Sequence, residues 1–155
     1  MKSTVYLLCG LPLSGKTFHS KKLENQLNIT LLSIDEEYFK VVGNTQQEYR
    51  DYKLEQDIEE KLKIKIIELL KSNKSIILDY GFWKKKKRDE YKKIIEDNGG
   101  EWRLIYFKTS KDELLQRLNK RNTLKHDNYQ YMTSIMLEDF YNKFEEPIDE
   151  DEEII

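Results

Sequence analysis

Residues 10–17 carry the pattern that most restricts what this chain can fold into. They read Gly-Leu-Pro-Leu-Ser-Gly-Lys-Thr and match G-x-x-x-x-G-K-[ST] at every fixed position. In this pattern the backbone N–H groups of a tight loop surround phosphate groups, the lysine reaches the β- and γ-phosphates, and the final hydroxyl ligates Mg²⁺. The loop also opens a helix whose positive end faces the same phosphates. We therefore predict a site for ATP and Mg²⁺ formed by Gly10, Leu11, Pro12, Leu13, Ser14, Gly15, Lys16 and Thr17.

The sequence on either side of the loop supplies the context that this motif requires. Residues 4–9 form a short apolar run rich in strand formers, and residues 16–27 contain no glycine or proline. The alternative is a glycine-rich turn without a ligand, which does not explain the Lys-Thr pair after the second glycine. Strand, loop and helix together predict Lys16 as a catalytic group and Thr17 as a metal ligand.

Composition favours one domain over residues 1–155. Charged residues make up 36% of the chain and hydrophobic residues 38%, which suits a buried core beneath a charged surface. No apolar run approaches the ~18 residues of a membrane span, and the N-terminus lacks a signal-peptide pattern. Cys9 is the single cysteine and is predicted to be a buried thiol. We expect a cytoplasmic monomer or homodimer that does not bind membranes.

The acidic residues concentrate at the C-terminus. Residues 145–153 carry seven acids and no bases, which leaves 27 bases and 22 acids in residues 1–144, a net charge of +5. This mildly basic body suits an anionic ligand such as ATP. We interpret the tail, residues 145–155, as a solvated end, and a docked segment is the alternative.

Strand and helix signals alternate along the chain. Strands are predicted at residues 4–9, 30–33, 75–79 and 102–107, with a short edge strand at 153–155. Helices are predicted over residues 16–27, 46–72, 84–97, 110–122 and 129–144, as well as directly after the second strand. This alternation indicates an α/β fold with a mostly parallel sheet covered by helices on both faces. Ligands of such sheets bind at the carboxyl ends of the strands.

Two acidic residues follow predicted strands and should lie at that edge. Asp35 follows the second strand and could accept the proton of an attacking hydroxyl group, whereas its alternative role is to cap the next helix. Asp79 ends the third strand and is predicted either to hold Mg²⁺ or to orient the acceptor substrate. Its alternative role is a turn cap. Trp83 follows shortly after and should line the acceptor pocket or pack in the core.

Basic residues form two further groups. Residues 84–88 are all basic and begin a predicted helix, where bases oppose the helix dipole by a few tenths of a kcal/mol each. Charge runs are usually solvated faces, and we favour that interpretation here; the alternative is an anion-facing role, with Arg88 as the candidate for contacting substrate. Arg117 and Arg121 share one helix face. We expect them to belong to a lid over residues 117–130 that brings arginines to the transferring phosphate, with surface salt bridges as the alternative.

Together the motifs resemble small bacterial P-loop kinase-like proteins, often named AAA-family ATPases, whose relatives include chloramphenicol phosphotransferase, zeta toxins and polynucleotide kinases. The resemblance rests on Gly-Leu-Pro-Leu-Ser-Gly-Lys-Thr, Leu-Ser-Ile-Asp-Glu-Glu, Leu-Asp-Tyr-Gly-Phe-Trp and Arg-Leu-Asn-Lys-Arg-Asn. It implies a three-layer α/β/α P-loop NTPase, similar to adenylate kinase, with parallel strands in the order 2-3-1-4 or 2-3-1-4-5 and a small helical lid. It also implies Asp35 as the acceptor-side base and Arg117 or Arg121 as lid arginines. Leu13 departs from the pattern, because a glycine often stands there.

Three functions fit these residues. The first is an ATP-dependent phosphotransferase, or kinase, that acts on a hydroxyl group of a small molecule. The second is a polynucleotide 5′-hydroxyl kinase, which needs a groove lined by bases and aromatic residues. The third is a nucleotide-binding ATPase or regulatory module. Asp35 and the lid arginines favour the first two, because a pure switch needs no acceptor base. We predict the first, with a small-molecule hydroxyl acceptor as the partner ahead of nucleic acid.

Overall fold

A parallel five-stranded sheet forms the centre of the molecule. The computed structural model describes residues 2–43, 50–124 and 132–155. The sheet has the strand order β2-β3-β1-β4-β5 and every neighbouring pair is parallel, as the family resemblance implied. The strands are β1 (Thr4–Cys9), β2 (Thr30–Leu32), β3 (Ile76–Gly81), β4 (Glu101–Tyr106) and β5 (Glu153–Ile154). The short edge strand predicted at the C-terminus is therefore present.

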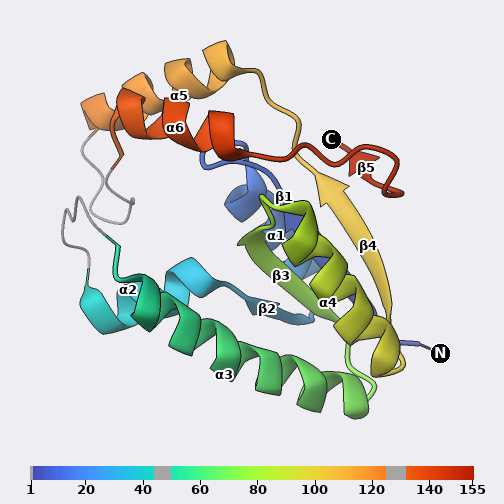
Figure 1. The fold of residues 1–155 in the computed structure, drawn as a ribbon. Helices are drawn as coiled ribbons and strands as arrows, with labels where there is room; N and C mark the ends of the chain where they lie inside the picture. Colours follow the sequence, from blue (N-terminus) through green and yellow to red (C-terminus); the bar gives the residue numbers. More distant parts are fainter. Residues whose placement is uncertain (1, 44–49, 125–131) are drawn as a thin grey trace.

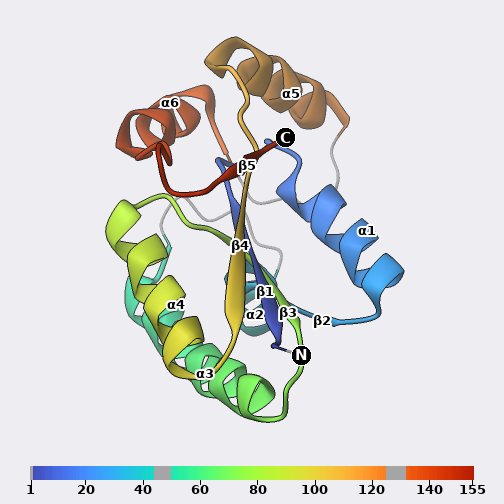
Figure 2. The same cartoon turned by 90° about the vertical axis from the view of Figure 1, so that its right-hand side faces the viewer.

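Helices cover both faces of the sheet and give the three-layer α/β/α arrangement (Figure 1). They are α1 (Lys16–Leu27), α2 (Ile34–Val42), α3 (Tyr52–Lys71), α4 (Lys85–Asp97), α5 (Lys111–Leu124) and α6 (Ser134–Lys143). Figure 2 shows α3 and α4 on one side of the strands and α1 on the other. None of the helices in the described ranges is long and apolar enough to cross a membrane.

Two helices begin later than the sequence predicted. Helix α3 begins at Tyr52, because the Asp51 side chain accepts a hydrogen bond from the Leu54 N–H and caps it. Helix α6 begins at Ser134, after a Thr133 cap. The remaining parts of these two predictions, residues 46–49 and 129–131, lie outside the described residues.

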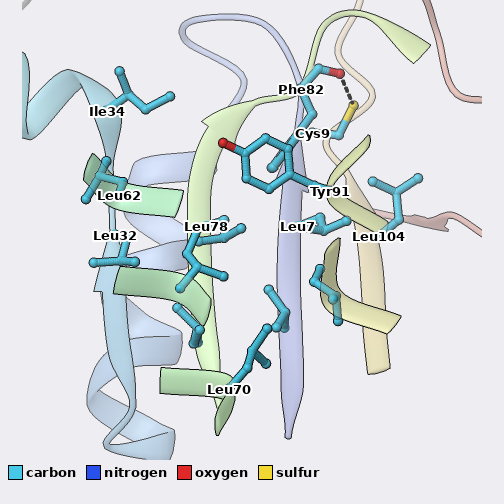
Figure 3. Packing of buried hydrophobic residues seen from close by; sticks show 14 of the residues in the cluster. Leu7, Cys9, Leu32, Ile34, Leu62, Leu70, Leu78, Phe82, Tyr91 and Leu104 are labelled. Atoms are coloured by element: carbon cyan, nitrogen blue, oxygen red, sulfur yellow. Dashed lines mark hydrogen bonds between the residues drawn. The ribbon is translucent and has the colours of Figure 1, made fainter. Parts of the chain in front are cut away.

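The core consists of apolar residues that alternate between the two faces of the strands. In β1, Val5, Leu7 and Cys9 belong to the cluster beneath α3 and α4, whereas Leu8 belongs to a cluster on the α1 side. A strand buried on both faces reads as a continuous apolar run, which explains the sequence of residues 4–9. Figure 3 shows the larger cluster around Leu7, Leu78 and Tyr91, with the Cys9 thiol donating to the Phe82 carbonyl oxygen at 3.4 Å.

The acidic tail docks on the body of the protein, so its interpretation as a solvated end is wrong and the alternative holds. Strand β5 pairs with β4, and the Ile155 N–H donates to the Tyr106 carbonyl oxygen at 2.9 Å. A Glu145 carboxylate oxygen accepts a hydrogen bond from the Lys85 N–H at 2.9 Å and so caps α4 from a distance. That contact places an anion where the helix dipole favours one and offsets the basic run.

Candidate functional site

A cavity of about 960 Å³ lies at the carboxyl ends of the strands. Its walls come from the loop after β1, the first turn of α2, the end of β3 and parts of α5 and α6. The structure brings together most of the residues that the sequence predicted for the site. The predicted site residues that line the cavity are Pro12, Leu13, Gly15, Lys16, Thr17, Asp35, Asp79, Arg117 and Arg121.

The loop at residues 10–17 holds its lysine close to its own backbone. Lys16 donates from Nζ to the Leu11 carbonyl oxygen at 2.8 Å. Burial lowers the pKa of Lys16, and the charges of Asp79 and Asp35 partly oppose that shift. The Ser14 hydroxyl oxygen is buried and has no hydrogen-bond partner within the described ranges. A buried polar atom of this kind needs a partner, but Ser14 lines a second cavity and not the one that Lys16 lines.

Leu13 adopts a backbone conformation that favours glycine. Its φ is 70°, in the left-handed region that costs an ordinary residue about 1–2 kcal/mol. The side chain packs against a second apolar cluster that includes Leu114 and Leu118 of α5. Arg117 adds a hydrogen bond from Nη1 to the Leu13 carbonyl oxygen at 2.7 Å. Contacts with α5 therefore stabilise Leu13 in its strained backbone conformation.

Thr17 and Asp79 lie together beside the loop. The Thr17 hydroxyl donates to Asp79 Oδ2 at 3.2 Å. Burial raises the pKa of Asp79, while Lys16 and the Thr17 hydrogen bond lower it by less. The turn-cap alternative for Asp79 is wrong, because β3 continues past it to Gly81. A positive ion at this point would stabilise the buried carboxylate.

The pair fits the way proteins hold Mg²⁺. This ion usually keeps several waters and binds one or two protein oxygens together with substrate phosphates, without a dedicated cage of side chains. Residues 2–43, 50–124 and 132–155 contain no group of three or more potential metal-ligating His, Cys, Asp or Glu residues.

Asp35 lies in the first turn of α2 and does not cap it. Ser33 is the N-cap, since its hydroxyl accepts a hydrogen bond from the Glu36 N–H at 3.2 Å. The capping alternative for Asp35 is therefore wrong, and its carboxylate is left to line the cavity. There Asp35 Oδ1 pairs with Nη2 of Arg50 at 2.6 Å.

Arg50 is a cavity residue that the sequence reasoning missed. It also pairs from Nε with Glu55 at 3.0 Å, and its guanidinium lies 4.5 Å above the ring of Tyr38. Burial lowers the pKa of Arg50, but Asp35 and Glu55 raise it by more. No local pattern could have found it, because the residue stands alone within a stretch that was assigned to a helix.

The two predicted lid arginines reach the cavity from α5. Arg117 forms the surface salt bridge that was its alternative role, because Nη2 pairs with Glu113 at 2.7 Å, and its Nη1 donates to the Leu13 carbonyl oxygen of the loop. Arg121 lies one turn further along the same helix and also lines the cavity. The rest of the predicted lid, residues 125–130, lies outside the described residues.

Arg88 does not face the cavity, so the prediction that it contacts substrate is wrong. Its side chain is 1% exposed and forms two hydrogen bonds with Glu150, at 3.0 and 2.8 Å. A third bond runs from Nη1 to the Phe82 carbonyl oxygen at 2.8 Å. Glu150 lies 62 residues away in the chain, too far for any local pattern to show the pairing. Arg88 is thus a structural residue that joins α4 to the tail.

Aromatic residues complete the walls of the cavity. Trp83 and Phe140 pack together with ring centroids 4.9 Å apart, and both line the cavity beside Phe39 and Tyr80. The Tyr80 hydroxyl oxygen is buried without a hydrogen-bond partner in the described part of the chain. Apolar faces with few polar groups are typical of small-molecule sites.

Known proteins share this fold. A family model described as an AAA domain matches residues 5–147. A gluconokinase from Sinorhizobium meliloti superposes with a TM-score of 0.64 at 18% identity, covering 99% of this chain and 81% of its own. Kti12 from Chaetomium thermophilum, solved with ADP-AlF3, has a TM-score of 0.74 at 15% identity, with 97% and 88% covered.

Nucleic-acid repair proteins share it as well. A chain of the Pnkp1/Rnl/Hen1 RNA repair complex has a TM-score of 0.76 at 16% identity, and the match covers 92% of this chain but 44% of the other. At these identities the likenesses establish the fold and leave the acceptor open. No curated protein sequence matches this chain.

Proposed function

This chain belongs to the AAA-domain family and has a P-loop kinase-like fold, and from that premise we propose that it is an ATP-dependent phosphotransferase acting on a hydroxyl group of a small molecule. One observation supports this proposal most directly. Asp35 and the loop at residues 10–17 line the same cavity, and the Asp35 carboxylate is not used as a helix cap. A carboxylate facing a nucleotide site is what an acceptor hydroxyl needs as a base.

In the proposed reaction each side chain has a separate task. The acceptor oxygen forms a bond to the γ-phosphorus of ATP, the bond from that phosphorus to the β,γ-bridging oxygen breaks, and ADP leaves. Asp35 takes the proton of the acceptor hydroxyl. Lys16, Arg117 and Arg121 neutralise negative charge on the phosphates. Because such transfers depend on positioning and charge stabilisation, the protein needs no covalent intermediate.

Thr17 and Asp79 would hold Mg²⁺ in this scheme. Bound there, the ion would neutralise charge on the β- and γ-phosphates. The Thr17 hydroxyl would ligate the ion directly, and Asp79 would bind either the ion or a water molecule on it. The two side chains are close enough to share one ion, since the Thr17 hydroxyl oxygen lies 3.2 Å from Asp79 Oδ2. Asp79 also lines the cavity and is the remaining candidate for orienting the acceptor.

The test compares Asp35→Asn with a matched control on the same helix. Glu37→Gln removes one charge from α2, but Glu37 pairs with Lys40 and does not line the cavity. Labelled ATP is incubated with metabolites, antibiotics and oligonucleotides, and products are identified by mass spectrometry. We expect Asp35→Asn to lower transfer by about 10²–10⁴-fold with ATP affinity nearly unchanged, and Glu37→Gln to leave both as they are.

Other outcomes would redirect the assignment. Normal transfer by Asp35→Asn would disprove the role of that carboxylate. Label on oligonucleotides alone would indicate a polynucleotide 5′-hydroxyl kinase, and label released only as free phosphate would indicate an ATPase or regulatory module.

A further inference from the structure

The wall of the cavity opposite the phosphate-binding loop has its own charge pattern. We call it the acceptor end, formed by the first turns of α2 and α3 and the residues close to them. It consists of Asp35, Glu36, Phe39, Arg50, Tyr52 and Glu55. The other charged residues described on the cavity wall are Lys16, Asp79, Arg117, Lys120, Arg121 and Asp139. Four of these six are cations, whereas three of the four charged residues of the acceptor end are carboxylates.

The described cations near the acceptor end are already paired. Arg50 contacts Asp35 at 2.6 Å on one side and Glu55 at 3.0 Å on the other, with the ring of Tyr38 against its face. Lys21 of α1 pairs with Glu36 at 2.7 Å from outside the cavity. An anionic acceptor would have to compete with these carboxylates for Arg50 or Lys21 among the described residues of this end. That competition leaves little net attraction.

Carboxylates outnumber cations at this end. Asp35, Glu36 and Glu55 face Arg50 and Lys21, which leaves one negative charge in excess. The side chains of Asp35 and Glu55 are 55% and 30% exposed, so a ligand can reach them. Burial raises the pKa of Glu55 although Arg50 lowers it, and the neighbouring Asp35 raises it further. A second positive charge beside Glu55 would balance the excess negative charge of the acceptor end.

Aromatic rings line the same cavity as these carboxylates. Phe39 and Tyr52 belong to the acceptor end, and Tyr80 lines the cavity from β3. A cavity lined by aromatic rings and carboxylates favours an ammonium group, because the ring faces and the anions both attract positive charge. They also offer the apolar faces on which the carbon skeleton of a small molecule can rest.

We propose that the acceptor is a small polyhydroxyl compound that carries a positively charged amino group, with Glu55 as the residue that recognises that group. This inference rests on the proposed function, since it names the substrate class of the same cavity. It argues against sugar acids, sugar phosphates and polynucleotides, whose negative charges need uncommitted cations in the protein. The acceptor hydroxyl would lie at Asp35 and the ammonium group at Glu55, both of which Arg50 holds in place.

The test uses acceptor sets of equal carbon number whose members differ in charge. One set is glucosamine, glucose and glucuronate, and a second is 3-amino-1,2-propanediol, glycerol and glycerate. Transfer of label from ATP is measured as kcat/KM for each compound, with a 5′-hydroxyl oligonucleotide as a further acceptor. We expect the cationic member to exceed the neutral one by about tenfold, equivalent to about 1.4 kcal/mol. The anionic members and the oligonucleotide should be the poorest acceptors.

Two variants connect this preference to one side chain. Glu55→Gln should reduce the preference for the cationic member several-fold while ATP affinity stays unchanged, which also verifies that the variant is folded. Glu60→Gln is the matched control, because Glu60 lies on the same helix, pairs with Lys63 and is absent from the cavity wall. A preference for the anionic members or the oligonucleotide, or a cation preference unchanged in Glu55→Gln, would overturn the inference and leave the proposed function standing.

Absence of transfer to any compound would count against the proposed function instead. In that case the inference is decided by binding, measured by saturation-transfer NMR with each set in the presence of a non-hydrolysable ATP analogue. Stronger binding of the cationic member that is lost in Glu55→Gln supports the inference. Equal binding of cationic, neutral and anionic members refutes it.

Discussion

The strongest stability prediction concerns the buried ion pair between α4 and the tail. Replacing Glu150 by glutamine keeps the shape of the side chain but removes its charge. Arg88 and Glu150 are 1% and 6% exposed, and Arg88 would keep the Phe82 carbonyl oxygen and the glutamine amide oxygen as acceptors but lose its ionic partner. Leaving one member of a buried pair without the other costs about 3–5 kcal/mol. For a domain of typical stability, about 5–15 kcal/mol, this is a large fraction of the total.

Urea unfolding followed by circular dichroism measures this loss. Asp149→Asn is the matched control, because Asp149 lies next to Glu150 but is exposed, and it should change the free energy of unfolding by less than about 0.5 kcal/mol. The double variant Arg88→Met with Glu150→Leu should recover most of the loss, since apolar replacement of a buried pair is often neutral. A free energy of unfolding for Glu150→Gln within about 0.5 kcal/mol of the natural protein would refute the reasoning.

The same pair should affect stability in acid. Burial raises the pKa of Glu150, but hydrogen bonds and charges from Arg88 and Lys92 outweigh it, and the net pKa lies below the ordinary value of 4.5. The folded-state pKa is therefore below the unfolded one. The ion pair makes its full contribution to the free energy of unfolding at pH values above the unfolded-state pKa of Glu150. That contribution is lost as the pH falls through the folded-state pKa. Glu150→Gln should lose less stability than the natural protein over this acidic range.

Three further measurements test the nucleotide loop and its surroundings. Lys16→Ala should weaken ATP binding, measured by calorimetry, by about ten- to a hundredfold and lower transfer with it, because it removes a charged hydrogen bond to phosphate. Leu13→Gly should be more stable to urea than Leu13→Ala by about 1 kcal/mol, since a φ of 70° strains alanine but not glycine. Cys9, whose pKa burial raises to about 12, should react with a thiol reagent only when urea unfolds the chain.

Local patterns were sufficient to predict the helices and strands and their alternation. The motif at residues 10–17 places a strand before it and a helix after it, and both are present as β1 and α1. Helix α5 follows Ser110, whose hydroxyl accepts from the Glu113 N–H at 3.2 Å, and a serine three residues before an acid is a typical helix cap. Such features depend on residues a few positions apart, which a single sequence shows directly. The strand order came from the family resemblance, because register between distant strands leaves no local mark.

Long-range pairs could not be predicted in the same way. Arg50 reaches back 15 residues to Asp35, and Arg88 reaches forward 62 residues to Glu150. Each arginine belongs to a stretch with many other charged residues, so its type and position look ordinary. The error on Arg88 had a physical origin. A base near a helix N-terminus suggested a ligand, but the compensating anion is the Glu145 carboxylate of the tail.

The tail and the nucleotide loop are connected through the segment that follows β3. Glu150 holds Arg88, and Arg88 donates to the Phe82 carbonyl oxygen at 2.8 Å. The neighbouring Gly81 carbonyl oxygen accepts a hydrogen bond from the Gly10 N–H, at the first residue of the loop. Phe82 itself has a φ of 49°, an uncommon conformation for a bulky residue that needs such support. The acidic tail thus helps to fix the strand end against which the phosphate-binding loop begins, although none of its acids lines the cavity.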